Sequence, residues 1–291
     1  MYTSVSRRIF VFFLYLFFIL FLLAILVPFL NVIAISFSSK KAVQEYRVVI
    51  VPVEFQTRAY EAILSSRIFA TSLANTVLLT VVNTTFTITV ALLAGYALAN
   101  KDFYGRRVVF IYFLIPMYFS GGLVPFYLTV NAYGLNNTRL ALILPYLVSV
   151  FYVIVFRNII SRLPREIMES AEVDGAADGA ILFRIILHLI LPTVAAFAIF
   201  SGVGFWNEWF AVLIFIRDQS KWTLQYLLRN IYTNPNLGGG VLDVVIDDPS
   251  NLLSQNLINA AIICTVAPIL VIYPFLQRYF IHGVLVGAVK E

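Results

Sequence analysis

Long apolar runs constrain this chain more than any other feature of its sequence. A helix that crosses a bilayer needs about 20 mostly apolar residues, and runs of about that length recur along the whole chain. We expect spanning helices at about residues 9–35, 73–99, 108–130, 140–156, 185–216 and 257–275. Ten-residue segments of alternating polarity, which are typical of membrane barrels, are not seen. The runs therefore predict an all-α integral membrane protein with six transmembrane helices.

The composition supports a single membrane domain over residues 1–291. Hydrophobic residues make up 61% of the chain and charged residues 12%, whereas soluble domains are about 45–50% apolar and about 25% charged. The net charge of +5 does not indicate a nucleic-acid partner, because the basic residues lie in short clusters beside apolar runs. That placement is typical of the cytoplasmic flanks of membrane helices.

The distribution of lysine and arginine predicts that both termini are cytoplasmic. The long loop after the first run is also basic, but charges in long loops count for less. The basic residues expected on the cytoplasmic side are Arg7, Arg8, Lys101, Arg106, Arg107, Arg157, Arg162, Arg165, Arg184, Arg278 and Lys290.

The residues that usually bind metals or nucleotides are sparse. Cys264 stands alone, and His188 and His282 lack the spacing of paired ligands, so we expect no metal site. The sequence has no Gly-rich Walker loop, which is the motif that cradles nucleotide phosphates. We therefore expect no cofactor in this chain.

A charged segment at residues 163–192 interrupts the apolar pattern between the fourth and fifth runs. Pro164 suits a first helical turn, and the acidic residues that follow it suit the positive end of a helix dipole. Ala171, Gly175 and Gly179 recur every four residues and give one helix face almost no side chains. A short helix at about residues 164–178 is predicted, either as a solvated connector or as a docking element for a soluble partner.

Three short motifs in this segment carry a resemblance to a known family. They are Glu169-Ser170-Ala171, Asp174-Gly175-Ala176 and Ile190-Leu191-Pro192. Together they resemble the EAA motif of binding-protein-dependent ABC importer permeases, with serine in place of the first alanine. Phe205-Trp206-Asn207 resembles the Trp-Asn pair of carbohydrate-type permeases, and residues 273–280 and 283–290 resemble the C-terminus of the maltose-permease-like branch. Residues 121–125, Gly-Gly-Leu-Val-Pro, resemble a subgroup linked to oligosaccharides from complex plant or algal polysaccharides.

The resemblance implies a function, a set of partners and a location. The chain would be a permease subunit in a bacterial inner membrane, beside a second, usually different, permease subunit. Two ATPase subunits would bind ATP and Mg²⁺, and an external solute-binding protein would deliver a sugar or oligosaccharide. The implied ATPase-coupling residues are Glu169, Ser170, Ala171, Asp174 and Gly175. The alternative is an ATP-independent secondary transporter, for which charged residues should lie near the middle of several spans.

The residues that could contact substrate leave two interpretations open. Glu208, with Trp206, Asn207 and Trp209 beside it, could form a sugar site, or the tryptophans could anchor the chain at the external interface. Asn75 and Asn83 could line a path or hydrogen-bond between helices. The external loop at residues 217–256, with its triplet Gly238–Gly240, could contact the binding protein or be an ordinary surface loop.

Overall fold

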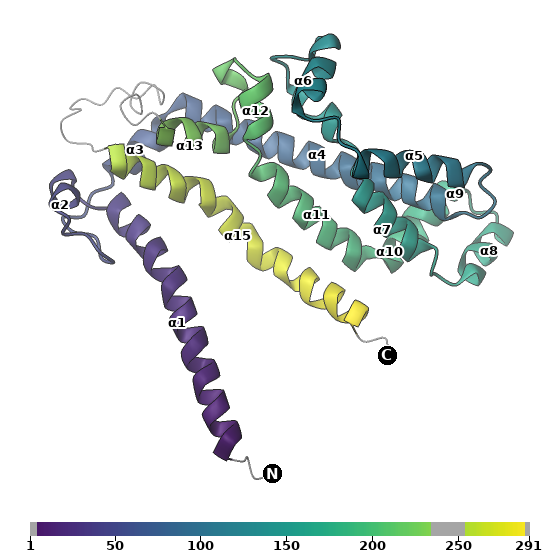
Figure 1. Cartoon of the computed structure of the whole chain (residues 1–291), viewed down its shortest axis with the longest axis horizontal. Helices are drawn as coiled ribbons and strands as arrows, with labels where there is room; N and C mark the ends of the chain where they lie inside the picture. The colour runs from purple at the N-terminus through teal and green to yellow at the C-terminus, as the bar shows by residue number, and fades with distance from the viewer. Residues whose placement is uncertain (1–4, 234–253, 289–291) are drawn as a thin grey trace. The chain divides into compact units, whose positions relative to one another are not determined.

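The computed structural model describes residues 5–233 and 254–288, and all of their regular structure is helical. The chain, whose helices are drawn in Figure 1, divides into two compact units. The first unit contains the residues up to Ala70 together with Leu227–Ala267, and the second contains Thr71–Tyr226 and the residues from Pro268 onward. Gly238–Gly240 and Lys290 lie outside the described residues.

The first unit is built on the long apolar helix α1 (Val5–Ser36). Most side chains of α1 are exposed, including Phe12, Phe17 and Phe21. An apolar surface of this extent is typical of a helix that faces lipid. The helix α15 (Ser254–Ala288) begins beside the end of α1, because the Asn256 amide donates to the carbonyl oxygens of Ile35 at 2.8 Å and Ser38 at 2.9 Å.

A small folded cap follows α1 in the same unit. It contains α2 (Lys40–Gln44) and α3 (Arg58–Ser65). The Ser39 hydroxyl accepts a hydrogen bond from the Ala42 N–H and so caps α2, as serine commonly does at a helix start. The Phe37 ring stacks on Tyr60, with centroids 4.4 Å apart. These contacts give the loop after α1 a defined structure, which the apolar pattern alone does not predict.

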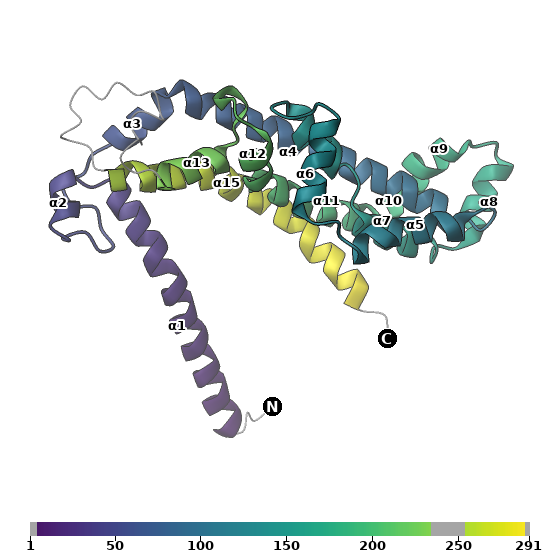
Figure 2. The ribbon, with the colours of Figure 1, turned by 45° about the horizontal axis from the view of Figure 1, so that its top comes forward.

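The second unit is organised along α4 (Arg67–Ala99). The elements that follow it are α5 (Arg106–Tyr118), α6 (Leu123–Ala132), η1 (Arg139–Leu142), η2 (Leu144–Tyr146), α7 (Val150–Ile160), α8 (Arg165–Val173), α9 (Asp178–Ala180), η3 (Ile181–Ile186), α10 (Leu187–Leu189), α11 (Leu191–Trp206), α12 (Phe210–Phe215) and η4 (Gln219–Lys221). The next helix, α13 (Leu224–Thr233), starts in the second unit and belongs to the first unit from Leu227 onward. Figures 1 and 2 show α5, α7, α8, α9 and α10 gathered around the carboxyl end of α4. Their shared core includes Leu92, Phe156, Ala171, Ile181 and Ile186.

Four helical segments of the described residues are long and apolar enough to cross a membrane: Arg7–Ser36, Arg67–Ala99, Arg139–Ile160 and Gln255–Ile272. Two bent helix pairs raise the number to six if each pair is one span. One pair is α5 with α6, bent by 118°, and the other is Asp178–Leu189 with α11, bent by 85°. By length and composition the described residues therefore offer four to six spans.

The bends divide two of the ranges expected from the sequence. Within 108–130, α5 ends at Tyr118 and α6 starts after Gly122, whose φ of 83° is readily adopted only by glycine. Within 185–216, the chain breaks at Ile190, before Pro192, because proline cannot donate the backbone hydrogen bond that would continue the helix. A further break between Trp206 and Phe210 separates α11 from α12.

Candidate coupling site and substrate path

The helix α8 is the structural counterpart of the short helix expected at about residues 164–178. It starts at Arg165, directly after Pro164, and carries Glu166 in its first turn. It ends at Val173, and the rest of the expected range forms a turn that leads to α9. The segment is therefore one short helix followed by a turn.

The turn after α8 explains the glycine of the motif. Gly175 has a φ of 81°, in the left-handed region that other L-residues adopt only at a cost. Its N–H donates to the Glu172 carbonyl at 3.0 Å, and the Ala176 N–H donates to the Ala171 carbonyl at 2.9 Å. A Cβ placed on Gly175 would have no atom within 4 Å. The glycine is therefore required for its backbone conformation and not for space.

The motif residues on α8 and in its turn face in different directions. Ala171 is 8% exposed and belongs to a core that also contains Ile160, Ile181 and Leu182, so it packs against its own chain. Glu169, Ser170, Asp174 and Gly175 are exposed. The Ser170 hydroxyl donates to the Ile167 carbonyl of its own helix at 3.1 Å. The carboxylates of Glu169 and Asp174 are thus placed where a partner can reach them.

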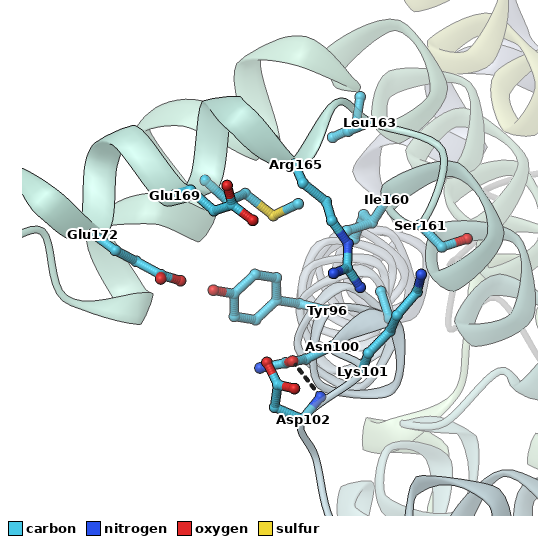
Figure 3. A pocket seen from close by; sticks show the side chains of 12 residues that line it. Tyr96, Asn100, Lys101, Asp102, Ile160, Ser161, Leu163, Arg165, Glu169 and Glu172 are labelled. Carbon is cyan, nitrogen blue, oxygen red and sulfur yellow. Dashed lines mark hydrogen bonds between the residues drawn. The ribbon is translucent and has the colours of Figure 1, made fainter.

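A cavity of about 170 Å³ lies between α8 and the carboxyl end of α4. One wall consists of Tyr96, Ala99, Asn100, Lys101 and Asp102, and the other of Ile160, Ser161, Leu163, Arg165, Met168, Glu169 and Glu172. Figure 3 shows the Glu172 carboxylate and the Tyr96 hydroxyl pointing toward each other, with Arg165 directed toward the α4 wall. The Tyr96 hydroxyl donates to Asp178 at 2.9 Å. The sequence did not lead us to expect that the end of α4 forms one wall of this cavity. The only feature of the sequence that pointed to this region was the basic cluster at residues 101–107.

The proposed sugar residues lie at the end of α11 and in the break that follows it. The Asn207 amide donates to the Val203 carbonyl at 2.8 Å and its oxygen accepts from Gln225 at 2.9 Å. The Glu208 carboxylate accepts from the Ala211 N–H at 2.8 Å, so it caps the first turn of α12. Trp209 packs edge-on against Phe210. These contacts give Asn207 and Glu208 roles in closing the break between the two helices.

Asn75 joins α4 to two distant segments of the second unit. Its amide nitrogen donates to the carbonyl oxygens of Ser220 at 2.8 Å and Trp222 at 3.1 Å. Its oxygen accepts from the Arg139 guanidinium at 2.9 Å. Asn75 is 3% exposed, and every hydrogen-bonding group of its side chain has a partner. This arrangement supports the interpretation of Asn75 as a residue that joins structural elements.

The next turns of α4 carry buried polar atoms that, unlike those of Asn75, are not all hydrogen-bonded. The Asn83 amide donates to the Leu142 carbonyl at 2.9 Å. The Asn83 Oδ1 atom and the hydroxyls of Thr80 and Thr84 have no hydrogen-bond partner among the described residues. The same is true of the indole N–H of Trp206, which is 6% exposed. Unpaired buried polar groups cost free energy, so a polar ligand or water molecule that reached these atoms would be held by hydrogen bonds that the described residues do not supply.

Residues 91–286 match the family model of the binding-protein-dependent transport system inner membrane component. The chain belongs to this family. The permease is 33% identical over 287 residues to the polygalacturonan/rhamnogalacturonan transport system permease protein YtcP of Bacillus subtilis (strain 168), covering 98% of this chain and 100% of YtcP. It is 35% identical over 268 residues to the protein LplC of the same organism, covering 91% of this chain and 89% of LplC.

Solved structures give the same assignment. The permease aligns, with a TM-score of 0.87 and 28% identity, with a chain in the crystal structure of a bacterial ABC transporter that imports the acidic polysaccharide alginate. The match covers 96% of the permease and 99% of that chain. The protein is therefore a multi-pass inner-membrane permease subunit of an ABC importer, and ATP hydrolysis belongs to a separate partner. Family membership also implies a partner permease and a solute-binding protein.

Proposed function

We propose that this permease forms, with a second and different permease subunit, the pathway by which an external binding protein delivers an oligosaccharide into the cell. Two ATPase subunits, which bind ATP and Mg²⁺, drive the transport. The observation that carries this proposal is α8 with its glycine turn, since the exposed carboxylates of Glu169 and Asp174 stand on an element that is packed into the core through Ala171. A docking element of this kind has no purpose in an ATP-independent carrier.

The topology that we propose has six spans and both termini in the cytoplasm. Each bent pair, α5 with α6 and the segment from Asp178 to Trp206, counts as one span. The positive flanks at Arg7, Lys101 and Arg165 then lie on the same side as α8, in agreement with the preference of basic residues for the cytoplasm. This places α8 where a cytoplasmic ATPase can reach it.

Within the coupling site the residues divide into two roles. Glu169, Ser170 and Asp174 contact the ATPase directly, because they are exposed. Ala171 and Gly175 set the shape of the element, the first by packing inward and the second by its left-handed φ. When the ATPases close on ATP, α8 moves with them, and the two states of the assembly then differ in their affinity for ATP and for the binding protein.

The substrate class that we propose is an oligosaccharide released from an acidic plant or algal polysaccharide. The support is the similarity to YtcP, which is named for polygalacturonan and rhamnogalacturonan, and to the alginate importer. The unpaired polar atoms of Thr80, Asn83 and Thr84 on α4 and of Trp206 on α11 supply hydrogen-bonding groups suited to sugar hydroxyls. We propose that these residues, rather than Asn75, line the substrate path.

The test is reconstitution of the permease in liposomes with a partner permease, an ATPase and a solute-binding protein. The sugar panel contains trigalacturonate, an oligoalginate, arabinotriose and maltotriose. We expect ATP-dependent uptake of one of the acidic sugars, and loss of uptake in Gly175→Val, because a β-branched residue resists the positive φ of the turn. Uptake by the permease alone, without ATP, would show that it is a secondary transporter. Uptake of maltotriose in preference to both trigalacturonate and the oligoalginate would overturn the proposed substrate class.

A further inference from the structure

The helices α4 and α7 make a close contact near the coupling site. None of the residues in this contact belongs to the motif at residues 169–192. A Cβ placed on the buried residue Gly95 would lie 2.8 Å from the Phe156 Cβ, 3.0 Å from the Arg157 backbone nitrogen and 3.3 Å from the Phe156 carbonyl carbon. Real Cβ atoms essentially never show the first of these distances. The α4 and α7 backbones thus approach so closely that only glycine fits at position 95.

The neighbouring residue Arg157 extends this contact to a third helix. Its Nε atom donates to the Leu98 carbonyl of α4 at 3.4 Å, and its guanidinium lies 4.1 Å from the centroid of the Phe110 ring of α5. An arginine over an aromatic face gains further attraction from the ring. We call the contacts of Gly95, Leu98, Phe110, Phe156 and Arg157 the α4–α5–α7 junction.

The junction is connected to α8 both by the chain and by packing. α7 ends at Ile160, and α8 starts at Arg165, so only a short turn separates them. Ile160 and Phe156 are 1% and 0% exposed and belong to the same core as Ala171 of α8. A displacement of α8 therefore acts on α7 within one helical turn of Arg157.

We propose that the α4–α5–α7 junction is the rigid point at which movement of α8 passes to α4 and α5, with Gly95 and Arg157 as positioning residues. The inference rests on the proposed function, since it assumes that an ATPase moves α8. The physical reason is that closely packed interiors transmit displacement, and at Gly95 no flexible side chain lies between the two backbones to absorb it. α4 carries the polar atoms of Thr80, Asn83 and Thr84, so the junction connects the coupling site to the proposed substrate path.

The first experiment compares Gly95→Ala with Gly204→Ala in the reconstituted complex. Gly204 is a matched control, because it is also in a helix but a Cβ there would have no atom within 4 Å. We expect Gly95→Ala to reduce the stimulation of ATP turnover by trigalacturonate-loaded binding protein at least about fivefold, the lower end of typical coupling. Basal turnover per assembled complex stays near native, and Gly204→Ala behaves as native. An assembled Gly95→Ala complex with native stimulation would overturn the inference.

A second experiment needs no substrate. In a Cys264→Ser background, spin labels are placed at Leu93 on α4 and Val173 on α8, which are 46% and 88% exposed. If the junction is rigid, the distance distribution between the labels in the native complex is the same with and without ATP. In Arg157→Met, which removes both contacts of the guanidinium without adding bulk, we expect the distance between the labels to change when ATP is added. In Arg157→Lys, which retains a cation near the Phe110 ring, we expect a smaller change.

These two measurements separate the inference from the proposed function. An ATP-dependent shift between the labels in the native complex would overturn the rigid junction, whatever the substrate. If the Gly95→Ala complex fails to assemble, the Arg157→Met complex provides the test. Native stimulation of ATP turnover together with an unchanged label distance in Arg157→Met would overturn the inference. Absence of stimulation by any sugar of the panel in the native complex contradicts the proposed function, while the label distances still test the junction.

Discussion

The carbonyl oxygen of Ala171 accepts a hydrogen bond from the Ala176 N–H at 2.9 Å, and this bond closes the turn after α8 around Gly175. The turn therefore joins the inward-packed alanine of the motif to the residue that leads into α9. A left-handed residue near the end of a helix, with such a closing bond, is a common way to terminate helices. The small residues of the motif thus shape this chain's own helix and turn, while the carboxylates of Glu169 and Asp174 remain exposed.

This geometry predicts that position 175 is selective for backbone conformation and not for size. Gly175→Val should destabilise the permease by about 1–2 kcal/mol or more, because a β-branched residue resists a positive φ. Gly175→Asn should be close to native, because asparagine tolerates that region. The midpoint of thermal unfolding in detergent and the sugar-stimulated ATP turnover measure the two effects.

Gly179→Ala is the matched control for this comparison. It lies in α9, a Cβ there would have no atom within 4 Å, and its φ is not positive. We expect native stability and turnover. If Gly175→Asn were as damaging as Gly175→Val, the side chain itself, rather than the backbone, would be excluded at position 175, and a partner must then approach the turn closely.

The inward position of Ala171 leads to a second prediction. Ala171→Leu would force extra volume into the core beside Ile160 and Ile181, and overpacking of this kind costs about 1–3 kcal/mol. Val173→Leu, at an 88% exposed position on the same helix, should have little effect on stability. Thermal unfolding of the two variants measures the difference. Equal stability would place Ala171 at an external contact.

The sequence was sufficient to predict the fold class and the family. The apolar runs predicted an all-helical membrane protein, and the motif at residues 169–192 predicted an ABC importer permease. Both predictions are confirmed by the match to the family model and by the alignment with the alginate importer. They depend on hydrophobicity and on residue types within one short segment, which can be read without knowledge of the tertiary contacts.

Other features depend on contacts between distant residues, so the sequence could not specify them. The bend between α5 and α6 depends on the φ of Gly122, and glycines also occur inside straight helices. The periodicity of Ala171 and Gly175 indicated a bare helix face but not whether that face meets a partner or the chain's own core. The partners of Asn75 lie 64 to 147 residues away, and nothing near Asn75 in the sequence points to them.

The bonds of Asn75 predict a loss of stability rather than a loss of substrate recognition. Asn75→Ala removes three hydrogen bonds and leaves the Arg139 guanidinium and two carbonyl groups without this partner. The expected cost is about 1–3 kcal/mol for each buried group that stays unsatisfied. Asn158→Ala, at an exposed position on α7, is the control and should unfold as the native protein does.

The same variant separates the two interpretations of Asn75. If Asn75 joins structural elements, the fraction of Asn75→Ala that folds should retain its preference among the sugars of the panel. A variant with native thermal stability and an altered sugar preference would instead place Asn75 on the substrate path.

The folded cap after α1 predicts a pH dependence that resides in Glu54. A hydrogen bond from the Ser39 hydroxyl and then one from Arg47 lower the pKa of the Glu54 carboxyl below its ordinary value of 4.5. A carboxyl whose pKa is depressed by folding stabilises the folded state above the unfolded pKa, and this contribution is lost as the pH falls through the folded pKa. The side chains of Glu54 and Arg47 are both exposed to solvent, so the contribution of this ion pair to stability is small and weakens with salt.

The measurement is the difference in unfolding midpoint between the native permease and Glu54→Gln from about pH 7 down to about pH 3. We expect a constant advantage of the native protein at the upper end, and a decline that starts below pH 4.5, the ordinary pKa of this carboxyl. Removing the Arg47 guanidinium in Arg47→Gln should reduce the advantage without abolishing it, because the Ser39 hydroxyl, the larger cause, still donates to the carboxylate. A difference that stays constant down to the acid limit, or that grows as the pH falls, would mean that the Glu54 carboxylate does not stabilise the cap.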